Sequence, residues 1–193
     1  MRKIDRASLM TLEAYARERE RFRVKVIAHK RNRTVHLGDH VTLLFEDDLT
    51  IRYQLQEMLH AERIFEKEDI QGELDTYNPL VPDGRNLKAT MMIEFTDVDE
   101  RRRGLAKLIG IEDRVWIQIQ GFERVWATAD EDLERSNDQK TSAVHFLRFE
   151  LSEVMALALK NGSELALGVD HPRYQARLDT APAVRDALSK DMA

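Results

Sequence analysis

The chain has 193 residues, of which 42% are hydrophobic and 34% charged, and its formal net charge is −5. This composition is typical of a soluble protein with its own core, and the absence of cysteine excludes disulfides, cysteine-ligated metals and thiol catalysis by this chain. Because no apolar run approaches the roughly 18 residues that span a bilayer, and the first residues lack the apolar segment of a signal peptide, we expect a cytoplasmic protein.

The first part of the chain has mainly helical patterns, with one region of alternating apolar residues. The two kinds of element differ in the period of their apolar residues, which is about 3.6 in helices and about 2 in strands. In chain order, the expected elements are a helix from Leu9 to about His29 capped by Ser8, a hairpin over Thr34–Phe45, and a helix capped by Asp48 or Thr50 with an acidic continuation to about Leu74. We therefore expect a helical part over about residues 8–75.

The second part, about residues 77–180, has mainly strand-like patterns. Its expected strands are Lys88–Phe95, two within Arg114–Ala129, His145–Leu151 and Glu164–Val169, and its expected helices are Val98–Leu108 and Ser152–Leu159. Pro182–Met192 is expected to be a terminal helix or a tail. Alternation places His145 on the same strand face as Leu147 and Phe149. Helices followed by strands favour an α+β fold of one domain, residues 1–193, in which long N-terminal helices pack on a mixed or mainly antiparallel sheet.

Charge is distributed unevenly along the chain. Residues 17–33 contain eight Lys or Arg and two Glu, whereas residues 46–75 contain ten acidic and three basic residues. Two helices of opposite charge are expected to pair, either within the chain or in a homodimer. The basic run could instead bind phosphate, but a protein that is acidic overall is not expected to bind nucleic acid.

One acidic residue of the second helix falls in its apolar stripe. On a helical wheel, Glu62 lies near the middle of the apolar stripe that faces the expected core. This stripe contains Ile51, Leu55, Met58, Leu59 and Phe65. Burying an unpaired carboxylate costs several kcal/mol, so Glu62 needs a partner. Arg19 or His29 of the basic helix can supply it, which predicts a buried polar cluster of Arg19, His29 and Glu62. A polar pocket between the two helices is the alternative.

Two sets of residues have the chemistry of metal ligands. Glu57 and His60 have the Glu-x-x-His spacing of a carboxylate-bridged metal site, but the chain has no matching second half-site. His29, His145 and His171 could converge on iron, zinc or manganese, although nothing in their spacing requires it. Surface or packing roles are the simpler interpretation of all five residues, so no cofactor is predicted as the first choice.

Five segments together resemble an uncharacterised bacterial family known only as a domain of unknown function. They are Leu43–Arg63, Tyr77–Gly84, Ile109–Arg135, His145–Leu151 and Gly168–Tyr174. The resemblance covers nearly the whole chain and implies genes that lie beside rubrerythrin-like di-iron proteins and an iron–sulfur oxidoreductase of the heterodisulfide-reductase type. The family has no established catalytic residues, so none can be carried over.

Two functions remain open from the sequence. The resemblance implies a cytoplasmic accessory protein that binds a rubrerythrin-like or iron–sulfur partner in peroxide or redox metabolism. The residues themselves leave room for a small metal-binding protein or metalloenzyme that uses histidine and carboxylate ligands. Bound metal in the purified protein would favour the second function.

Overall fold

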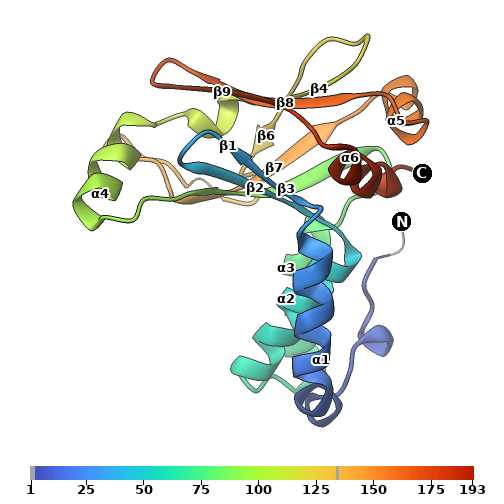
Figure 1. The fold of residues 1–193 in the computed structure, drawn as a ribbon. Coiled ribbons are helices and arrows are strands. Elements are labelled where there is room, and N and C mark those ends of the chain that lie inside the picture. The colour runs from blue at the N-terminus through green and yellow to red at the C-terminus, as the bar shows by residue number, and fades with distance from the viewer. Residues whose placement is uncertain (1–2, 134) are drawn as a thin grey trace.

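The chain forms two antiparallel sheets and a group of helices that projects from them (Figure 1), in a computed structural model that describes residues 3–133 and 135–193. The predicted α+β class is confirmed, with the strands divided between a five-stranded sheet of order β1-β2-β3-β7-β6 and a four-stranded sheet of order β5-β4-β8-β9. The strands are β1 (Thr34–Leu37), β2 (Val41–Glu46), β3 (Asn86–Ile93), β4 (Val115–Ile119), β5 (Val125–Trp126), β6 (Thr128–Ala129), β7 (Val144–Glu150), β8 (Leu165–His171) and β9 (Tyr174–Asp179). The helices are α1 (Leu12–Lys30), α2 (Asp48–Ala61), α3 (Lys67–Tyr77), α4 (Val98–Lys107), α5 (Glu153–Lys160) and α6 (Pro182–Leu188), with short 3₁₀ turns η1 (Arg6–Ser8), η2 (Asn78–Leu80), η3 (Ile111–Arg114) and η4 (Ser189–Asp191).

The main core lies between the facing sides of the two sheets, which are stacked one above the other in Figure 1. Each strand contributes every second side chain, because successive side chains point to opposite faces of a sheet. The buried set includes Leu87, Ala89, Met91 and Ile93 of β3, Leu147 and Phe149 of β7, Ile117 and Ile119 of β4, and Leu165, Leu167 and Val169 of β8. Each large apolar side chain buried here stabilises the fold by about 1.5–3 kcal/mol.

The chain passes from one sheet to the other between β5 and β6, at Ala127. Strand β5 pairs with β4 in the four-stranded sheet, whereas β6 pairs with β7 at the edge of the other sheet. The amide of Ala127 donates to the Val115 carbonyl at 2.9 Å, so the crossing residue is still held by the first sheet. The loop that follows β6 therefore starts beside β7.

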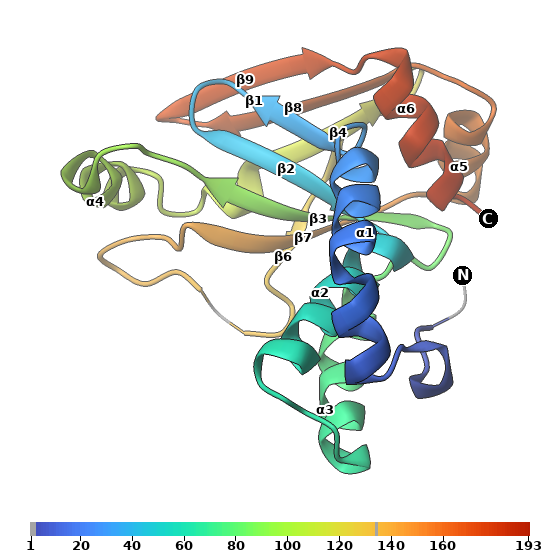
Figure 2. The same ribbon diagram turned by 60° about the horizontal axis from the view of Figure 1, so that its bottom comes forward.

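Helices α1, α2 and α3 extend away from the sheets (Figures 1 and 2) and enclose a second apolar cluster. This cluster contains Ile51, Leu55 and Leu59 of α2, Leu74 of α3, and Ile4 and Val81. Asp47 caps α2, and Thr50, one of the two predicted cap residues, completes a reciprocal capping box with it. Within residues 3–133 and 135–193, no helix combines the length and the apolar character needed to cross a membrane.

Candidate functional site

The predicted cluster of Arg19, His29 and Glu62 does not form, because Glu62 is exposed. Helix α2 ends one residue earlier, and Glu62 is its C-cap. Arg63 then turns the chain with a φ of 54°, and the side chain of Ile64 packs on the apolar cluster instead. The prediction was wrong because it continued the helical wheel past the end of the helix.

Arg19 pairs instead with Glu57, so the oppositely charged helices do contact each other. The guanidinium donates from Nε and Nη2 to the two carboxylate oxygens at 2.8 and 2.7 Å, and the buried Tyr15 hydroxyl donates to Oε1 at 2.5 Å. The hydrogen bonds from Arg19 lower the pKa of Glu57 to about 2. The ring of His60 packs edge-on against Tyr15, with centroids 5.8 Å apart. The Glu-x-x-His spacing thus serves helix packing.

We expect Glu57→Gln to lower the free energy of unfolding by about 1–2 kcal/mol at pH 7, because it removes a charge-assisted pair that is partly exposed. The carboxylate has a lower pKa in the folded state than its usual 4.5. Its contribution is therefore complete above about pH 4.5 and is lost as the pH falls towards 2. Urea unfolding of wild type and variant across this pH range measures the difference.

Glu62→Gln is the matched control for that variant. Glu62 is exposed, so its replacement should change the free energy of unfolding by less than about 0.5 kcal/mol. An equal loss in both variants would contradict the assignment of Glu57 as the residue that joins α1 and α2.

His29 belongs to a different cluster, at the junction of α1 with the sheets. Its Nε2 lies 2.5 Å from Asp47, the cap of α2. Arg33 lies 3.4 Å from the same carboxylate and also pairs with Asp191 near the C-terminus. Burial raises the pKa of Asp191 to about 6, and Arg33 opposes this shift. His29 therefore helps to join the helices to the sheets.

His171 lies at the end of β8 and is held by backbone atoms. Its Nε2 is 3.2 Å from the Ile109 carbonyl, and its Nδ1 accepts a hydrogen bond from the Arg173 amide at 3.2 Å. The three histidines His29, His145 and His171 thus have separate partners and do not converge. In the described part of the chain, the group of potential metal ligands with closely spaced atoms is Glu112, Asp130 and His145.

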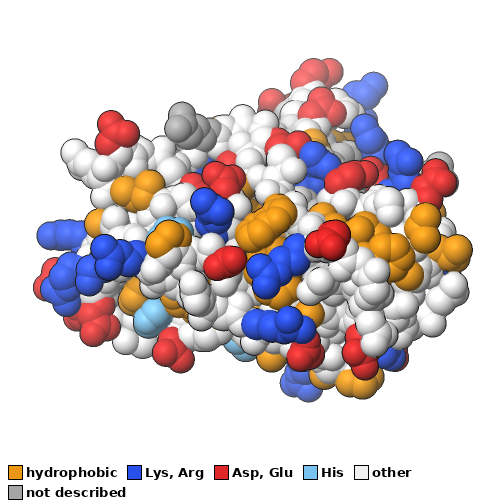
Figure 3. Space-filling model, turned by 90° about the horizontal axis from the view of Figure 1, so that it is seen from above, with side chains coloured by type: hydrophobic (Ala, Val, Ile, Leu, Met, Phe, Trp, Pro, Cys, Tyr) orange, Lys and Arg blue, Asp and Glu red, His pale blue; other side chains and the backbone are white. Residues whose placement is uncertain are grey.

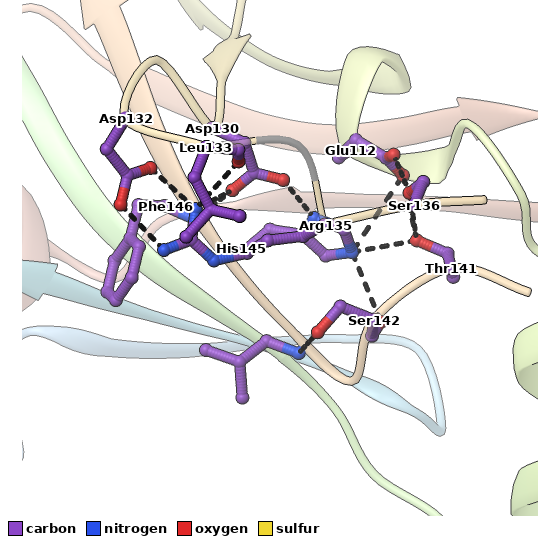
Figure 4. Close-up of polar contacts among 11 residues, drawn as sticks. Glu112, Asp130, Asp132, Leu133, Arg135, Ser136, Thr141, Ser142, His145 and Phe146 are labelled. Atoms are coloured by element: carbon purple, nitrogen blue, oxygen red, sulfur yellow. Dashed lines mark hydrogen bonds and ion pairs between the residues drawn. The ribbon is translucent and has the colours of Figure 1, made fainter.

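These three residues, with Ser136 and Thr141, form what we call the His145 cluster (Figure 4). His145 is fully buried on β7 and faces the core, as the alternation predicts. Asp130 follows β6 directly and has a φ of 49°. Its backbone amide and its carboxylate both bond to Phe146, at 2.9 and 3.0 Å, which holds this uncommon conformation.

The imidazole of His145 lies between two carboxylates. Nδ1 is 2.6 Å from Asp130, and Nε2 is 3.9 Å from Glu112 on η3. The Thr141 hydroxyl lies between Nε2 and Glu112, 2.8 Å from the first and 3.1 Å from the second. The Ser136 hydroxyl donates to the other oxygen of Glu112. Oxygen atoms of Glu112 and Thr141 therefore lie near Nε2, while Asp130 orients the ring through Nδ1 on its other side.

Arg135 connects the cluster to the outer face of the sheet. Its guanidinium lies 3.3 Å from Asp130 and 2.5 Å from Asp132, and it stacks over the Phe146 ring with its Cζ 4.7 Å from the centroid. The hydrogen bonds from Arg135 lower the pKa of Asp132 to about 2. Burial raises the pKa of Asp113, and the nearby charges of Glu112 and Asp130 raise it further. Glu112 and Asp130 thus place two carboxylates beside the buried imidazole.

The sequence indicated His145 as a candidate but gave no indication of its partners. Glu112, Asp130, Ser136 and Thr141 lie in a 3₁₀ turn and a polar loop, where no periodicity indicates which way a side chain points. One weak signal was present in the sequence: the acidic residue Asp130 comes immediately after the strand-like segment Arg114–Ala129. Functional residues concentrate in loops at strand ends, so this position was a candidate.

These features define an α+β protein of two stacked antiparallel sheets with a buried histidine–carboxylate cluster. The chain belongs to the family described as "Protein of unknown function (DUF3501)", which matches residues 3–192. It is also similar to a novel protein of unknown function from Burkholderia pseudomallei, whose crystal structure has 52% sequence identity, a TM-score of 0.94 and coverage of 100% of both chains. No curated protein matches the chain. The association with rubrerythrin implied by the resemblance stays a prediction.

Proposed function

We propose that this chain is a small metal-binding protein whose His145 cluster holds one divalent ion of iron, manganese or zinc. The observation that supports this most is the arrangement around His145 Nε2, which faces the Glu112 carboxylate, the Thr141 hydroxyl and the Ser142 carbonyl. One imidazole nitrogen with several oxygens is a donor set that suits these ions. The residues close to His145 are thus carboxylates, whereas the sequence suggested His29 and His171 as its fellow ligands.

The distances are compatible with an ion between Nε2 and Glu112. Bonds from such an ion to nitrogen and oxygen are about 2.0–2.2 Å long, so two atoms that share it lie about 3–4 Å apart. The separation of His145 Nε2 and Glu112 Oε2 is 3.9 Å. Asp130 contacts the opposite ring nitrogen at 2.6 Å, as carboxylates do that orient metal-binding histidines. Glu112 and His145 would be ligands, and Asp130 would position the ring.

Titration of the metal-free protein tests this proposal. Tag-free protein, treated with a chelator, is titrated with Zn²⁺, Mn²⁺ or anaerobic Fe²⁺ in a calorimeter, and purified protein is analysed for metal. We expect one equivalent of metal per chain and a rise in melting temperature on addition of metal, because the ion binds the folded state. His145→Gln and Glu112→Gln should each weaken binding by about 100-fold or more.

His36→Gln is the control, since His36 is an exposed histidine on β1 outside the cluster. It should bind metal as the wild type does. Circular dichroism confirms that each variant is folded. Wild-type protein that takes up no metal, or cluster variants that bind as tightly as wild type, would show that the cluster is a structural hydrogen-bond network.

Protein binding is a second candidate function, supported by an apolar groove of about 1270 Å³ at the far end of the helical group. Leu9, Leu12, Ile64 and Ile70 line the groove, and the Phe65 side chain beside them is 69% exposed. Exposed apolar patches of this kind often mark interaction sites. In the predicted redox role, an iron–sulfur cluster held by cysteine would have to belong to the partner, because this chain has none.

Purified rubrerythrin-type and iron–sulfur proteins are the probes for that second function. We expect binding that weakens at least tenfold in Phe65→Ser, since removal of a central aromatic anchor commonly costs about 2 kcal/mol or more. Val98→Ser is the control, because Val98 is 59% exposed on α4, away from the groove. Absence of binding, or equal binding by both variants, would contradict this function.

Across the face in Figure 3, basic and acidic side chains are intermixed, so that face gives no support to nucleic-acid binding.

A further inference from the structure

A cavity of about 550 Å³ lies between the outer face of the five-stranded sheet and the α2–α3 helices. Its size is within the range of about 300–1,000 Å³ that is typical of small-molecule sites. Tyr77, Leu80 and Phe146 supply apolar wall, while Lys88 and Arg148 come from the sheet. The residues that line the cavity do not include Glu112, Asp130 or His145, so a ligand here does not require metal in the His145 cluster.

The register of the sheet brings the two cations together. Lys88 of β3 is paired directly with Arg148 of β7, and both side chains point away from the core. Like charges opposite each other across strands are unfavourable unless they are compensated. Arg148 is compensated by Glu131 at 2.8 Å and Glu150 at 2.7 Å. Lys88 has no such carboxylate contact among the described residues.

The hydrogen bond that Lys88 makes within the described chain goes to the Pro79 carbonyl. A lysine ammonium has three donors, so two remain. Burial lowers the pKa of Lys88 and the nearby charge of Arg148 lowers it further, while the negative charges of Asp83, Glu131 and Glu150 compensate for this only in part. An anion placed beside the ammonium would supply that compensation.

Four carboxylates line the cavity, and each already accepts hydrogen bonds. Asp75 accepts one from the Gln71 amide at 2.8 Å in an exposed position. Glu131 accepts both hydrogen bonds of the Arg148 fork, and Asp132 accepts two from Arg135. Glu46 is buried and accepts from Thr50 and Gln54 of α2 and from Thr90 of β3. Of the three cations that line the cavity, Arg135 and Arg148 are paired with carboxylates. The ammonium of Lys88 is therefore the lining cation without a carboxylate partner among the described residues.

We propose that this cavity binds a small organic anion, with its carboxylate, sulfonate or phosphate group on Lys88 and its apolar or aromatic body against Tyr77, Leu80 and Phe146. The cation selects for the charge, and the apolar wall selects for the body. A free inorganic anion would make only the first of these contacts and should bind weakly.

Two dyes of matched shape test the proposal. 8-Anilinonaphthalene-1-sulfonate carries an anionic group on an aromatic body, and N-phenyl-1-naphthylamine is the same body without the charge. We expect saturable fluorescence binding of the anionic dye at one site per chain. Lys88→Met should weaken it about tenfold or more, as expected for loss of a charge-assisted hydrogen bond, and should leave the neutral dye within about twofold.

Three further variants make the test specific. Lys107→Met removes an exposed lysine at the end of α4 and should change neither dye. Gln54→Trp fills the cavity from α2 and should weaken both dyes, with circular dichroism to confirm folding. Phe65→Ser should leave the anionic dye bound. The proposal is overturned if Lys88→Met binds the anionic dye as tightly as wild type, or if Phe65→Ser abolishes that binding.

Discussion

Replacing Arg33 by methionine should lower the free energy of unfolding by about 3–5 kcal/mol, because it leaves buried carboxylates without their cation. Arg33 is 1% exposed and donates to the carbonyls of Phe45, Glu46 and Ala187 at 2.9, 3.1 and 3.2 Å. It also pairs with Asp191 on η4. One side chain thus joins the end of α1 to β2 and to the C-terminal helix. Urea unfolding at pH 7 measures the loss.

The pH dependence of that loss identifies its cause. Asp191 has a folded-state pKa of about 6, above its usual 3.8. The folded protein therefore binds this proton more readily than the unfolded chain, and the contribution of Asp191 to stability rises as the pH falls from about 6 to 4. Once Asp191 is neutral, the missing cation matters less, so the gap between Arg33→Met and wild type should narrow from pH 7 to pH 5. A constant gap would mean that lost packing dominates.

Gly168→Ala should destabilise the protein by about 3 kcal/mol, because the added methyl group has no space. Gly168 is paired with Trp116 between β8 and β4. A Cβ atom there would lie 2.3 Å from the Trp116 ring and 2.7 Å from the Ala176 carbonyl oxygen. The ring is 2% exposed and the carbonyl belongs to a paired strand, so neither can move cheaply. Thermal unfolding, with tryptophan fluorescence as the signal, measures the effect.

Gly72→Ala is the matched substitution with the opposite expected sign. Gly72 lies inside α3, and a Cβ there would meet nothing within 4 Å. Alanine should therefore stabilise the protein by about 0.5–1 kcal/mol through its better helix propensity. If both substitutions destabilised the protein to a similar extent, the cause would not be the space around Gly168.

The elements and their faces were largely predictable from the sequence. The hairpin expected over Thr34–Phe45 forms as β1 and β2, and the face predicted for His145 is the buried one. These features depend on residues a few positions apart, so the period of apolar side chains reveals them. The division of the strands into two sheets was not predictable in this way, because it depends on pairing between distant segments.

For the charged residues too, the sequence indicated the need for a partner, while contacts between distant segments decided which residue it is. The charge pattern predicted a partner for Arg19 on the acidic helix, and that partner is Glu57 instead of the expected Glu62. Arg33 ends the basic run that was expected to pair with the acidic helix or to bind phosphate, yet it is among the most buried side chains and pairs with Asp191. Charge alone indicates that a partner is needed, while the end of a helix and the packing of a distant C-terminal segment decide which residue fills that role.

By itself, the sequence determined the α+β class, the order of most elements and the inward face of His145, because local periodicity and capping are properties of neighbouring residues. Only the tertiary structure decided which histidine meets carboxylates. Glu112, Asp130 and His145 come from a 3₁₀ turn, a strand end and a strand, and they meet where the chain crosses from one sheet to the other. Their convergence depends on how the two sheets stack, which no local pattern records.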